Sequence, residues 1–182
     1  MKKKIWIPVA AVVTAFVATA CFKNDDGPSC VPNQLSTDRA SIDSFISAND
    51  IGYLTYMNEG YYQGIANPGT GSTAAADSIV EFKHTISAFN GSTFVKIAEQ
   101  EIKTNNNGTP IRFSDIDNTL NPAYYYLITN AAQGGSMRQI FPSSRNPLGY
   151  LSCEQQTINN ALVPAYSQIV EDIVLTTVKK GS

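Results

Sequence analysis

The sequence predicts an α+β fold in which a curled antiparallel β-sheet wraps over one short helix, with a second short helix near the N-terminus. Two observations lead to this prediction. Several segments alternate apolar and polar residues with the period of two that a β-strand requires, and turn residues separate them. One helical pattern follows late in the chain. Strands joined by hairpins pair antiparallel, and a single helix then covers one face of their sheet.

The N-terminal residues form a secretory signal pattern. Lys2, Lys3 and Lys4 precede an apolar run over residues 5–17, and small residues follow up to Cys21. The run is too short to span a bilayer comfortably. A cysteine directly after small residues resembles a lipobox, in which the thiol is acylated; an ordinary cleaved signal with an incidental cysteine is the alternative. We therefore expect a lipoprotein signal peptide over residues 1–20 and lipidation of Cys21.

Residues 21–35 are expected to form a lipid-anchored tether, because they are polar and hold few apolar anchors. Lys23 followed by Asp25 and Asp26 is similar to the export signals that send some Gram-negative lipoproteins to the outer face of the outer membrane. The expected location is the cell envelope, with the protein lipid-anchored to the outer membrane. Periplasmic and surface-exposed positions are both open.

The composition limits the partners and cofactors of the remaining domain. The net charge is -2 and 15% of the residues are charged, without the basic stripe that nucleic-acid binding needs, so no nucleic-acid partner is expected. Cys30 and Cys153 form an even pair in an oxidising compartment and are candidates for a disulfide. Together with His84 they are too few for a metal site, so no metal and no other cofactor is expected. We expect a monomer.

A short helical segment is expected over residues 36–52, before the main domain at residues 53–180. The capping residues at 36–38 begin it, and it ends near Asn49. Its apolar face consists of Ile42, Phe45 and Ile46.

Strand patterns follow. Alternation occurs over residues 53–57 and 61–66 and stops at a turn signal, Asn67-Pro68-Gly69. Asn90-Gly91 predicts a tight hairpin after the next strand. That strand has two sides, with Val80, Phe82, His84 and Ile86 on one and Glu81, Lys83 and Thr85 on the other.

The second half of the domain contains the main helix. Residues 99–110 are polar and predict an exposed loop. Asn121 followed by Pro122 predicts a helix start, and Gly134-Gly135 its end. The apolar face of this helix consists of Tyr124, Leu127, Ile128 and Ala131. A final strand over residues 167–178 has Ile169, Glu171, Ile173 and Leu175 on one side.

Six segments between Gly60 and Val178 carry a resemblance to a known family. They are, in order, GYYQGIANPGTG, DSIVEFKHTISAFNGSTF, NPAYYYLI, GGSMRQIFPSS, LGY and VPAYSQIVEDIVL. This order resembles the FKBP-type peptidyl-prolyl cis-trans isomerases, whose corresponding places read G-L-Y-Y with P-G-T-G, D-G-T-x-F-D, I-P-G-W, G-G-x-x-R-x-x-I-P-S, L-A-Y-G and I-P-P-x-x-x-L-x-F-D-V-E-L. The resemblance implies an FKBP-like domain at residues 53–180 of a lipoprotein from a Gram-negative bacterium.

The resemblance also implies a substrate pocket. Phe94 matches a pocket phenylalanine, and Tyr124 takes the place of the tryptophan at the pocket floor. Tyr150 matches the tyrosine whose hydroxyl holds a ligand carbonyl. Leu120 and Val163 match apolar contacts of the pocket wall and of the last loop.

Four positions depart from the family pattern. Val95 stands where the family usually has aspartate, and His84 where it has a pocket tyrosine. Asn121 stands where the family has isoleucine with a backbone donor, and Glu171 where it has phenylalanine. A buried Glu171 costs several kcal/mol unless it is paired. We therefore expect a compensating pair of His84 and Glu171 in a wetter pocket; a Glu171 that faces solvent is the alternative.

An isomerase of this type needs neither a nucleophile nor a metal, because it acts by binding the twisted amide more tightly than the planar one. The lack of any Ser/His/Asp or Cys/His set counts against hydrolases and leaves this activity open. The resemblance implies a weak isomerase that acts on proline-containing polypeptides and assists the folding of exported proteins. The alternative is a non-catalytic FKBP-like lipoprotein that binds peptides or a partner.

Overall fold

The computed structural model describes residues 31, 33–91, 93–117, 119, 121–145 and 153–181. The expected signal peptide, Cys21, Cys30, Leu120 and Tyr150 lie outside these residues, so what was expected of them stays a prediction. Cys153 is disulfide-bonded. No helix among the described residues is long and apolar enough to cross a membrane.

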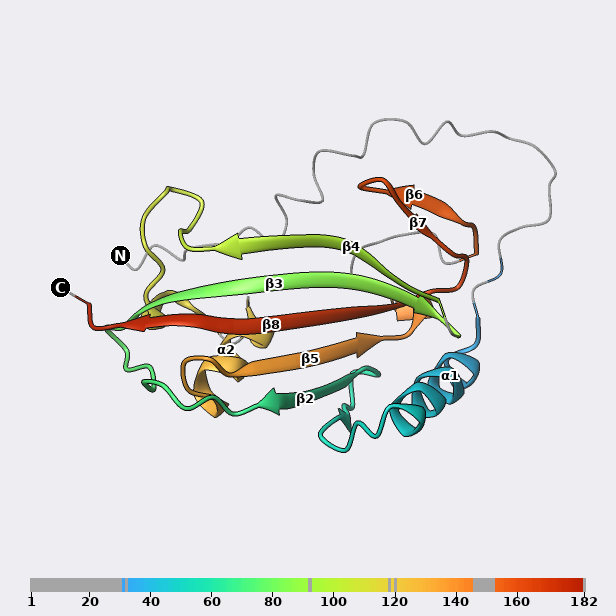
Figure 1. Ribbon diagram of the computed structural model, residues 1–182, viewed down its shortest axis with the longest axis horizontal. Coiled ribbons are helices and arrows are strands. Elements are labelled where there is room, and N and C mark those ends of the chain that lie inside the picture. The colour runs from blue at the N-terminus through green and yellow to red at the C-terminus, as the bar shows by residue number, and fades with distance from the viewer. Residues whose placement is uncertain are drawn as a thin grey trace.

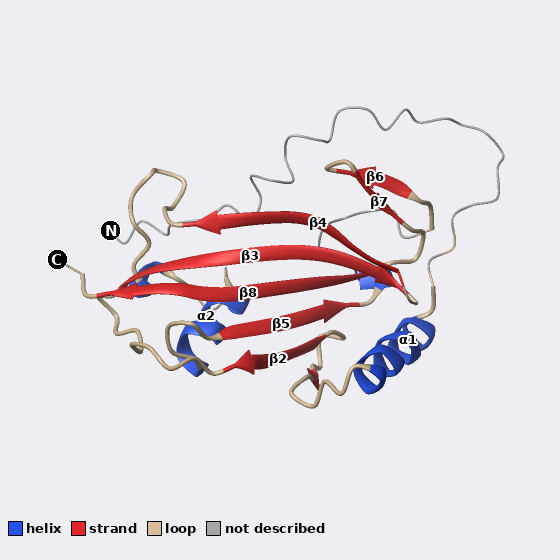
Figure 2. Ribbon diagram, in the orientation of Figure 1, coloured by secondary structure: helices blue, strands red, loops and turns tan. Residues whose placement is uncertain are grey.

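The described residues form one main antiparallel sheet with the strand order β1-β2-β5-β8-β3-β4 (Figure 1). Its long central strands, β3 and β8, pair along nearly their whole length. A separate hairpin, β6-β7, lies beside β4. The predicted α+β class, a sheet over one short helix, is confirmed (Figure 2). The strands are β1 (Thr55–Tyr56), β2 (Tyr62–Asn67), β3 (Ile79–Asn90), β4 (Thr93–Ile102), β5 (Ser136–Phe141), β6 (Gln156–Ile158), β7 (Ala161–Val163) and β8 (Gln168–Lys179).

The two central strands have the sides that their period of two predicts. In β3, Val80, Phe82 and His84 are buried while the residues between them are partly exposed. In β8, Glu171 and Ile173 share the same buried side. Because cross-strand partners share a face, the pairing of His84 with Ile173 brings these inward residues of both strands together.

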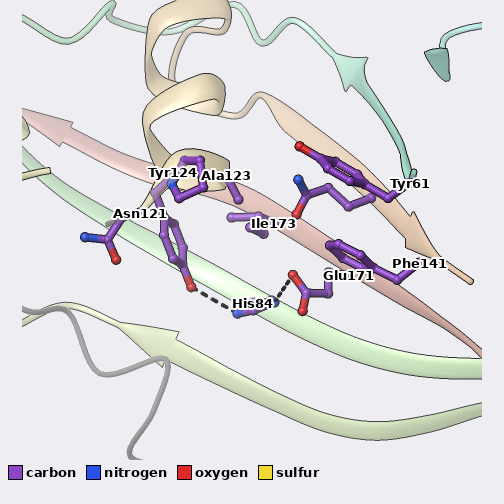
Figure 3. Close-up of a pocket in the computed structure, with 10 residues that line it drawn as sticks. Tyr61, His84, Asn121, Ala123, Tyr124, Phe141, Glu171 and Ile173 are labelled. Carbon is purple, nitrogen blue, oxygen red and sulfur yellow. Dashed lines mark hydrogen bonds and ion pairs between the residues drawn. The ribbon is translucent and has the colours of Figure 1, made fainter. Parts of the chain in front are cut away.

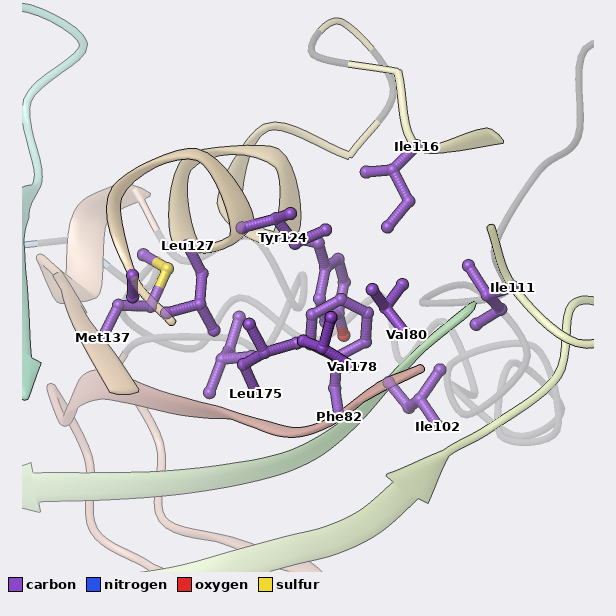
Figure 4. Packing of buried hydrophobic residues seen from close by; sticks show 13 residues of the cluster. Val80, Phe82, Ile102, Ile111, Ile116, Tyr124, Leu127, Met137, Leu175 and Val178 are labelled. Atoms are coloured by element: carbon purple, nitrogen blue, oxygen red, sulfur yellow. The ribbon is translucent and has the colours of Figure 1, made fainter. Parts of the chain in front are cut away.

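The α-helix α2 (Pro122–Asn130) covers one face of the sheet and closes the main core. Its Tyr124, Leu127 and Ile128 are buried against residues of β3, β5 and β8 (Figure 4). Burying a large apolar side chain stabilises the fold by about 1.5–3 kcal/mol relative to leaving it exposed. The strand residues in this cluster are Val80, Phe82, Met137, Ile173, Leu175, Val178 and, from β4, Ile102.

The end of α2 differs from the prediction. The helix ends at Asn130, because Ala131 already has an extended backbone with φ -141 and ψ 156. The side chains of Thr129 and Asn130 donate hydrogen bonds to the backbone carbonyls of the last turn. Gly134, which was expected to end the helix, has φ +84 and lies in the turn before β5.

The α-helix α1 (Leu35–Ala48) packs on the opposite face of the sheet. Its fully buried Ile42 contacts a cluster that includes Ile140 and Val170, which alternate with the residues facing α2. The helix begins at Leu35, so Asp38 lies inside its first turn and does not cap it. Two short 3₁₀ helices, Phe113–Asp115 and Ser143–Arg145, complete the described elements.

The strand β4 corrects another prediction. It extends to Ile102, so residues 99–102 form part of an edge strand instead of the expected polar loop. Its pairing with β3 shifts register between Ile86 and Ser87, which leaves Ile97 as the extra residue of a β-bulge. Beyond the bulge, Phe94 lies opposite Phe89.

The β6-β7 hairpin was not predicted. Asn159 and Asn160 connect its strands, and both have positive φ angles, of 49 and 64 degrees. Asparagine tolerates this region better than most residues, so the pair is a hairpin signal that the sequence already contained. Through Val163 the hairpin packs on a third cluster with Ala88, Ile97 and Ile169.

Candidate functional site

A pocket of about 320 Å³ lies where the N-terminal turn of α2 meets β3, β5 and β8. Most of its lining is apolar, and it contains three aromatic side chains. The lining residues are Tyr61, His84, Asn121, Pro122, Ala123, Tyr124, Gln139, Phe141, Glu171 and Ile173. The volume lies at the lower end of the range for small-ligand sites, about 300–1,000 Å³.

The apolar part of the pocket has aromatic walls on two sides. The rings of Tyr61 and Phe141 stack, with their centroids 5.1 Å apart. Tyr124 lies across from them, and Ile173 lies between (Figure 3). Such a site sheds water easily and binds the flat or ring-shaped apolar part of a ligand.

A chain of three polar groups crosses the pocket floor from α2 to β8. The Tyr124 hydroxyl lies 3.0 Å from His84 Nδ1, and His84 Nε2 lies 3.7 Å from Glu171 Oε2 (Figure 3). The second distance suits an ion pair but is too long for a hydrogen bond, and Nε2 has no hydrogen-bond partner among the described residues. All three side chains are buried, with only 11% of the Glu171 side chain exposed.

The protonated hydroxyl of Tyr124 determines which group donates in the contact with His84. Burial raises the pKa of the Tyr124 phenol, and the nearby charge of Glu171 raises it further. The hydroxyl therefore keeps its proton. When His84 is neutral, this hydroxyl donates to Nδ1, so that Nε2 carries the imidazole proton and points it toward the Glu171 carboxylate.

Amide side chains continue the polar floor toward the sheet edge. Gln139 Nε2 donates to Gln63 Oε1 at 2.8 Å, and the Tyr61 hydroxyl donates to the same oxygen at 3.2 Å. Gln63 pairs with Gln139, and Gln139 pairs with Glu171, so these three residues form one row across β2, β5 and β8. Glu171 and His84 in this floor stand at the two positions where the resemblance implied aromatic side chains.

Four of the candidate residues named from the sequence line this one pocket: His84, Asn121, Tyr124 and Glu171. His84 and Glu171 lie within ion-pair distance of one another, and Glu171 faces inward. Asn121 makes no side-chain cap to α2, and its backbone N–H donates to the Asp117 carbonyl. Its buried Nδ2 has no partner among the described residues.

Three other candidates lie elsewhere. Phe94 is 49% exposed and stacks with Phe45 of α1, because the bulge at Ile97 turns it to the face opposite the pocket. Val95 lies opposite Ala88 and does not line the pocket. Val163 is buried in the third cluster beside the pocket, where it packs near Phe141 without forming the lining.

No protein-family model and no curated protein matches this chain. Among solved structures, a peptidyl-prolyl cis-trans isomerase from Pseudomonas syringae pv. tomato is similar at 14% identity and a TM-score of 0.38, over 82% of this chain and 98% of that one. FkpA from Escherichia coli is similar at 16% identity and a TM-score of 0.38, over 81% of this chain.

The chain spans only 62% of the FkpA chain. A DUF4827 family protein from Parabacteroides distasonis is also similar, at 15% identity and a TM-score of 0.37, over 78% of this chain and 94% of that one. These TM-scores are low, so the likeness tells nothing of activity or of pocket residues.

Sequence reasoning did not select several residues of the lining. Ile173 was expected on the same side as Glu171, so its position follows from the period of two. Gln139 and Phe141 alternate with Arg138 and Ile140 in the same way. Tyr61 precedes β2 and reaches the pocket through its stacking on Phe141, which no local pattern indicates.

Proposed function

We propose that the pocket binds proline-containing peptides and that the chain is a peptidyl-prolyl cis-trans isomerase of low activity. The observation that carries this proposal is the pocket under α2, enclosed by the rings of Tyr61, Tyr124 and Phe141. The barrier to rotation about an amide is about 18–20 kcal/mol, and a pocket that holds the twisted amide in place of water lowers it. No nucleophile is needed for this reaction.

Two observations explain why the activity is expected to be low. Phe94 and Val95, at positions where the family has pocket residues, do not reach this pocket. His84 and Glu171 make the floor of the pocket polar. A polar floor binds water well, so a twisted, weakly polar amide displaces that water less readily. The same polar floor favours a second candidate function, the binding of peptides without catalysis.

The test is the exchange between cis and trans forms of a proline peptide, measured by exchange NMR with and without the protein. Tyr61→Ala removes one aromatic wall without touching the main core, and we expect it to lower the catalysed exchange rate by about tenfold, about 1.4 kcal/mol. Tyr125→Ala removes a half-buried tyrosine of α2 outside the pocket and serves as the control.

The outcomes separate the two functions. Peptide binding without any increase in the exchange rate leaves the non-catalytic alternative. If Tyr61→Ala and Tyr125→Ala behave alike, the pocket is not the site. A wild-type protein that neither binds the peptide nor speeds its exchange ends both proposals.

We also propose that the protein is anchored to the outer membrane by a lipid on Cys21 and assists the folding of exported proteins in the envelope. The signal pattern before Cys21 supports this. Cys21→Ser should abolish incorporation of radiolabelled fatty acid and release the protein from the membrane fraction, whereas Cys30→Ser should leave both unchanged. Absence of label on the wild type would contradict the anchor. Protease treatment of intact cells then distinguishes a periplasmic from a surface-exposed domain.

A further inference from the structure

Among the described residues, the Glu171 carboxylate is the one acidic group of the pocket lining, and its ion-pair contact there is long. In the described part of the chain its ion-pair partner is His84, at 3.7 Å, and no lysine or arginine forms an ion pair with it. This separation is too long for a hydrogen bond, so among the described residues no cationic side chain is hydrogen-bonded to the carboxylate. A buried carboxylate without such a partner is strongly destabilising unless a cation reaches it.

The walls beside Glu171 favour a cation as well. The faces of aromatic rings attract ammonium and guanidinium groups, and the attraction is stronger where water is excluded. Tyr61, Phe141 and Tyr124 line the same pocket as Glu171. The aliphatic stem of a lysine or arginine side chain fits an apolar wall while its charged head contacts a carboxylate. An acidic side chain would instead be repelled.

The pocket also has room for more than one ring. At about 320 Å³ it is within the range of sites that take drug-sized ligands, which are much larger than a proline ring. A peptide can therefore place its proline against the apolar walls and an adjacent side chain toward the floor.

We propose that the pocket selects peptides in which a basic residue stands next to the proline, with the charged head of that residue on Glu171. This inference rests on the proposed function, since it names the peptide class that the same pocket takes. Glu171 is a specificity-determining residue in this arrangement, and His84 Nε2 lies 3.7 Å from its carboxylate.

The experiment compares four peptides that differ only in the residue before proline: arginine, its neutral isostere citrulline, leucine and glutamate. Dissociation constants are measured by NMR titration of the full domain at neutral pH. We expect the arginine peptide to bind at least about tenfold more tightly than the citrulline and leucine peptides. The glutamate peptide should bind most weakly. A lysine peptide tells whether an ammonium group serves as well as a guanidinium group.

Two protein variants complete the test. Glu171→Gln keeps the shape of the side chain and should abolish the preference for arginine over citrulline while the leucine peptide still binds. Glu101→Gln makes the same charge change at an exposed position of β4 and should keep the preference. The comparison of the arginine and citrulline peptides uses the wild-type protein alone, so it still tests the inference if Glu171→Gln fails to fold.

Two results would overturn the inference and spare the proposed function. One is equal binding of the arginine and citrulline peptides to the wild type. The other is an arginine preference that survives in folded Glu171→Gln. If no proline peptide binds at all, the inference and the proposed function are both lost.

Discussion

His84 joins three elements through one imidazole, because it lies on β3 and contacts Tyr124 of α2 and Glu171 of β8. A tyrosine, which the family pattern has at this position, carries one polar group, its hydroxyl. Histidine carries two ring nitrogens, and here each of them faces a different neighbour. His84 and Glu171 stand in place of two aromatic residues of the family pattern. Because they contact each other, the two differences together make the pocket floor polar. Replacing one of the two residues removes the ion-pair partner of the other.

Tyr62 offers a test of how burial acts on a phenol on the other face of the sheet. Burial and a hydrogen bond from its hydroxyl to Asp43 raise the pKa of Tyr62 to about 12, from an ordinary value of 10.0. The folded protein thus holds this proton more tightly than the unfolded chain. The stabilisation is fully present below pH 10.0 and is lost as the pH rises toward about 12.

We expect Tyr62→Phe to lower the free energy of unfolding by about 0.5–1.5 kcal/mol at neutral pH, because a hydrogen bond is lost. Above pH 10.0 the variant should lose stability less steeply than the wild type, since one titrating phenol is gone. Urea denaturation of both proteins across this pH range checks it. Parallel curves would show that the Tyr62 phenol does not couple to folding.

At the scale of elements, the docking of α1 depends on one buried acid. Asp38 is fully buried, and its carboxylate accepts hydrogen bonds from the hydroxyls of Ser143 and Ser144, the Ser144 N–H and the amide of Gln168. Asn33 donates a further one. These contacts join α1 to the 3₁₀ helix after β5 and to the first residue of β8, so they hold the helix on the face opposite α2.

We expect Asp38→Ala to lower the free energy of unfolding by about 3 kcal/mol, because several buried donors lose their charged acceptor together. Asp38→Asn should cost less, since an amide oxygen still accepts. Glu59→Ala, at an exposed position, should stay within about 0.5 kcal/mol of the wild type. Urea denaturation measures all three. A wild-type value for Asp38→Ala would mean that α1 docks through its apolar face alone.

At the scale of the whole described structure, the main sheet has an α-helix on each face, and the β6-β7 hairpin lies beside it. The two helices cover different ends of the central strands, since α2 packs against Phe82 and Leu175, whereas α1 packs against Phe89 and Val170. The pocket lies on the α2 face. It is therefore separated from α1 by the sheet, and changes in α1 docking should alter stability more than peptide binding.

A disulfide between Cys30 and Cys153 is our prediction at this scale. Cys153 is disulfide-bonded, and the other two cysteines, Cys21 and Cys30, lie outside the described residues. With Cys21 lipidated, Cys30 is the remaining partner. Closing a loop this long should stabilise the domain by about 4 kcal/mol in the chain-entropy model. Thiol labelling without reductant should find no free cysteine in the mature protein and one in Cys30→Ser; a free thiol in the wild type would contradict the bridge.

Local patterns in the sequence were sufficient for much of the fold. The period of two placed His84 and Glu171 on the inward sides of their strands, and Asn121-Pro122 marked the start of α2. Asn90-Gly91 marked the turn between β3 and β4, where Gly91 has φ +61. These features depend on backbone conformation and on the alternation of side chains, which a few neighbouring residues determine.

Contacts between distant segments decided the rest. The bulge at Ile97 reversed the side on which Phe94 lies, and the sequence of β4 shows no signal for it because a bulge depends on the pairing with β3. The stacking of Tyr61 on Phe141 and the burial of Asp38 against Ser143 likewise join residues far apart in the chain. The sequence by itself determined which side chains face inward on the central strands. Only the tertiary structure decided which of them meet in one pocket, because strand order, register and helix docking depend on all the packed elements at once.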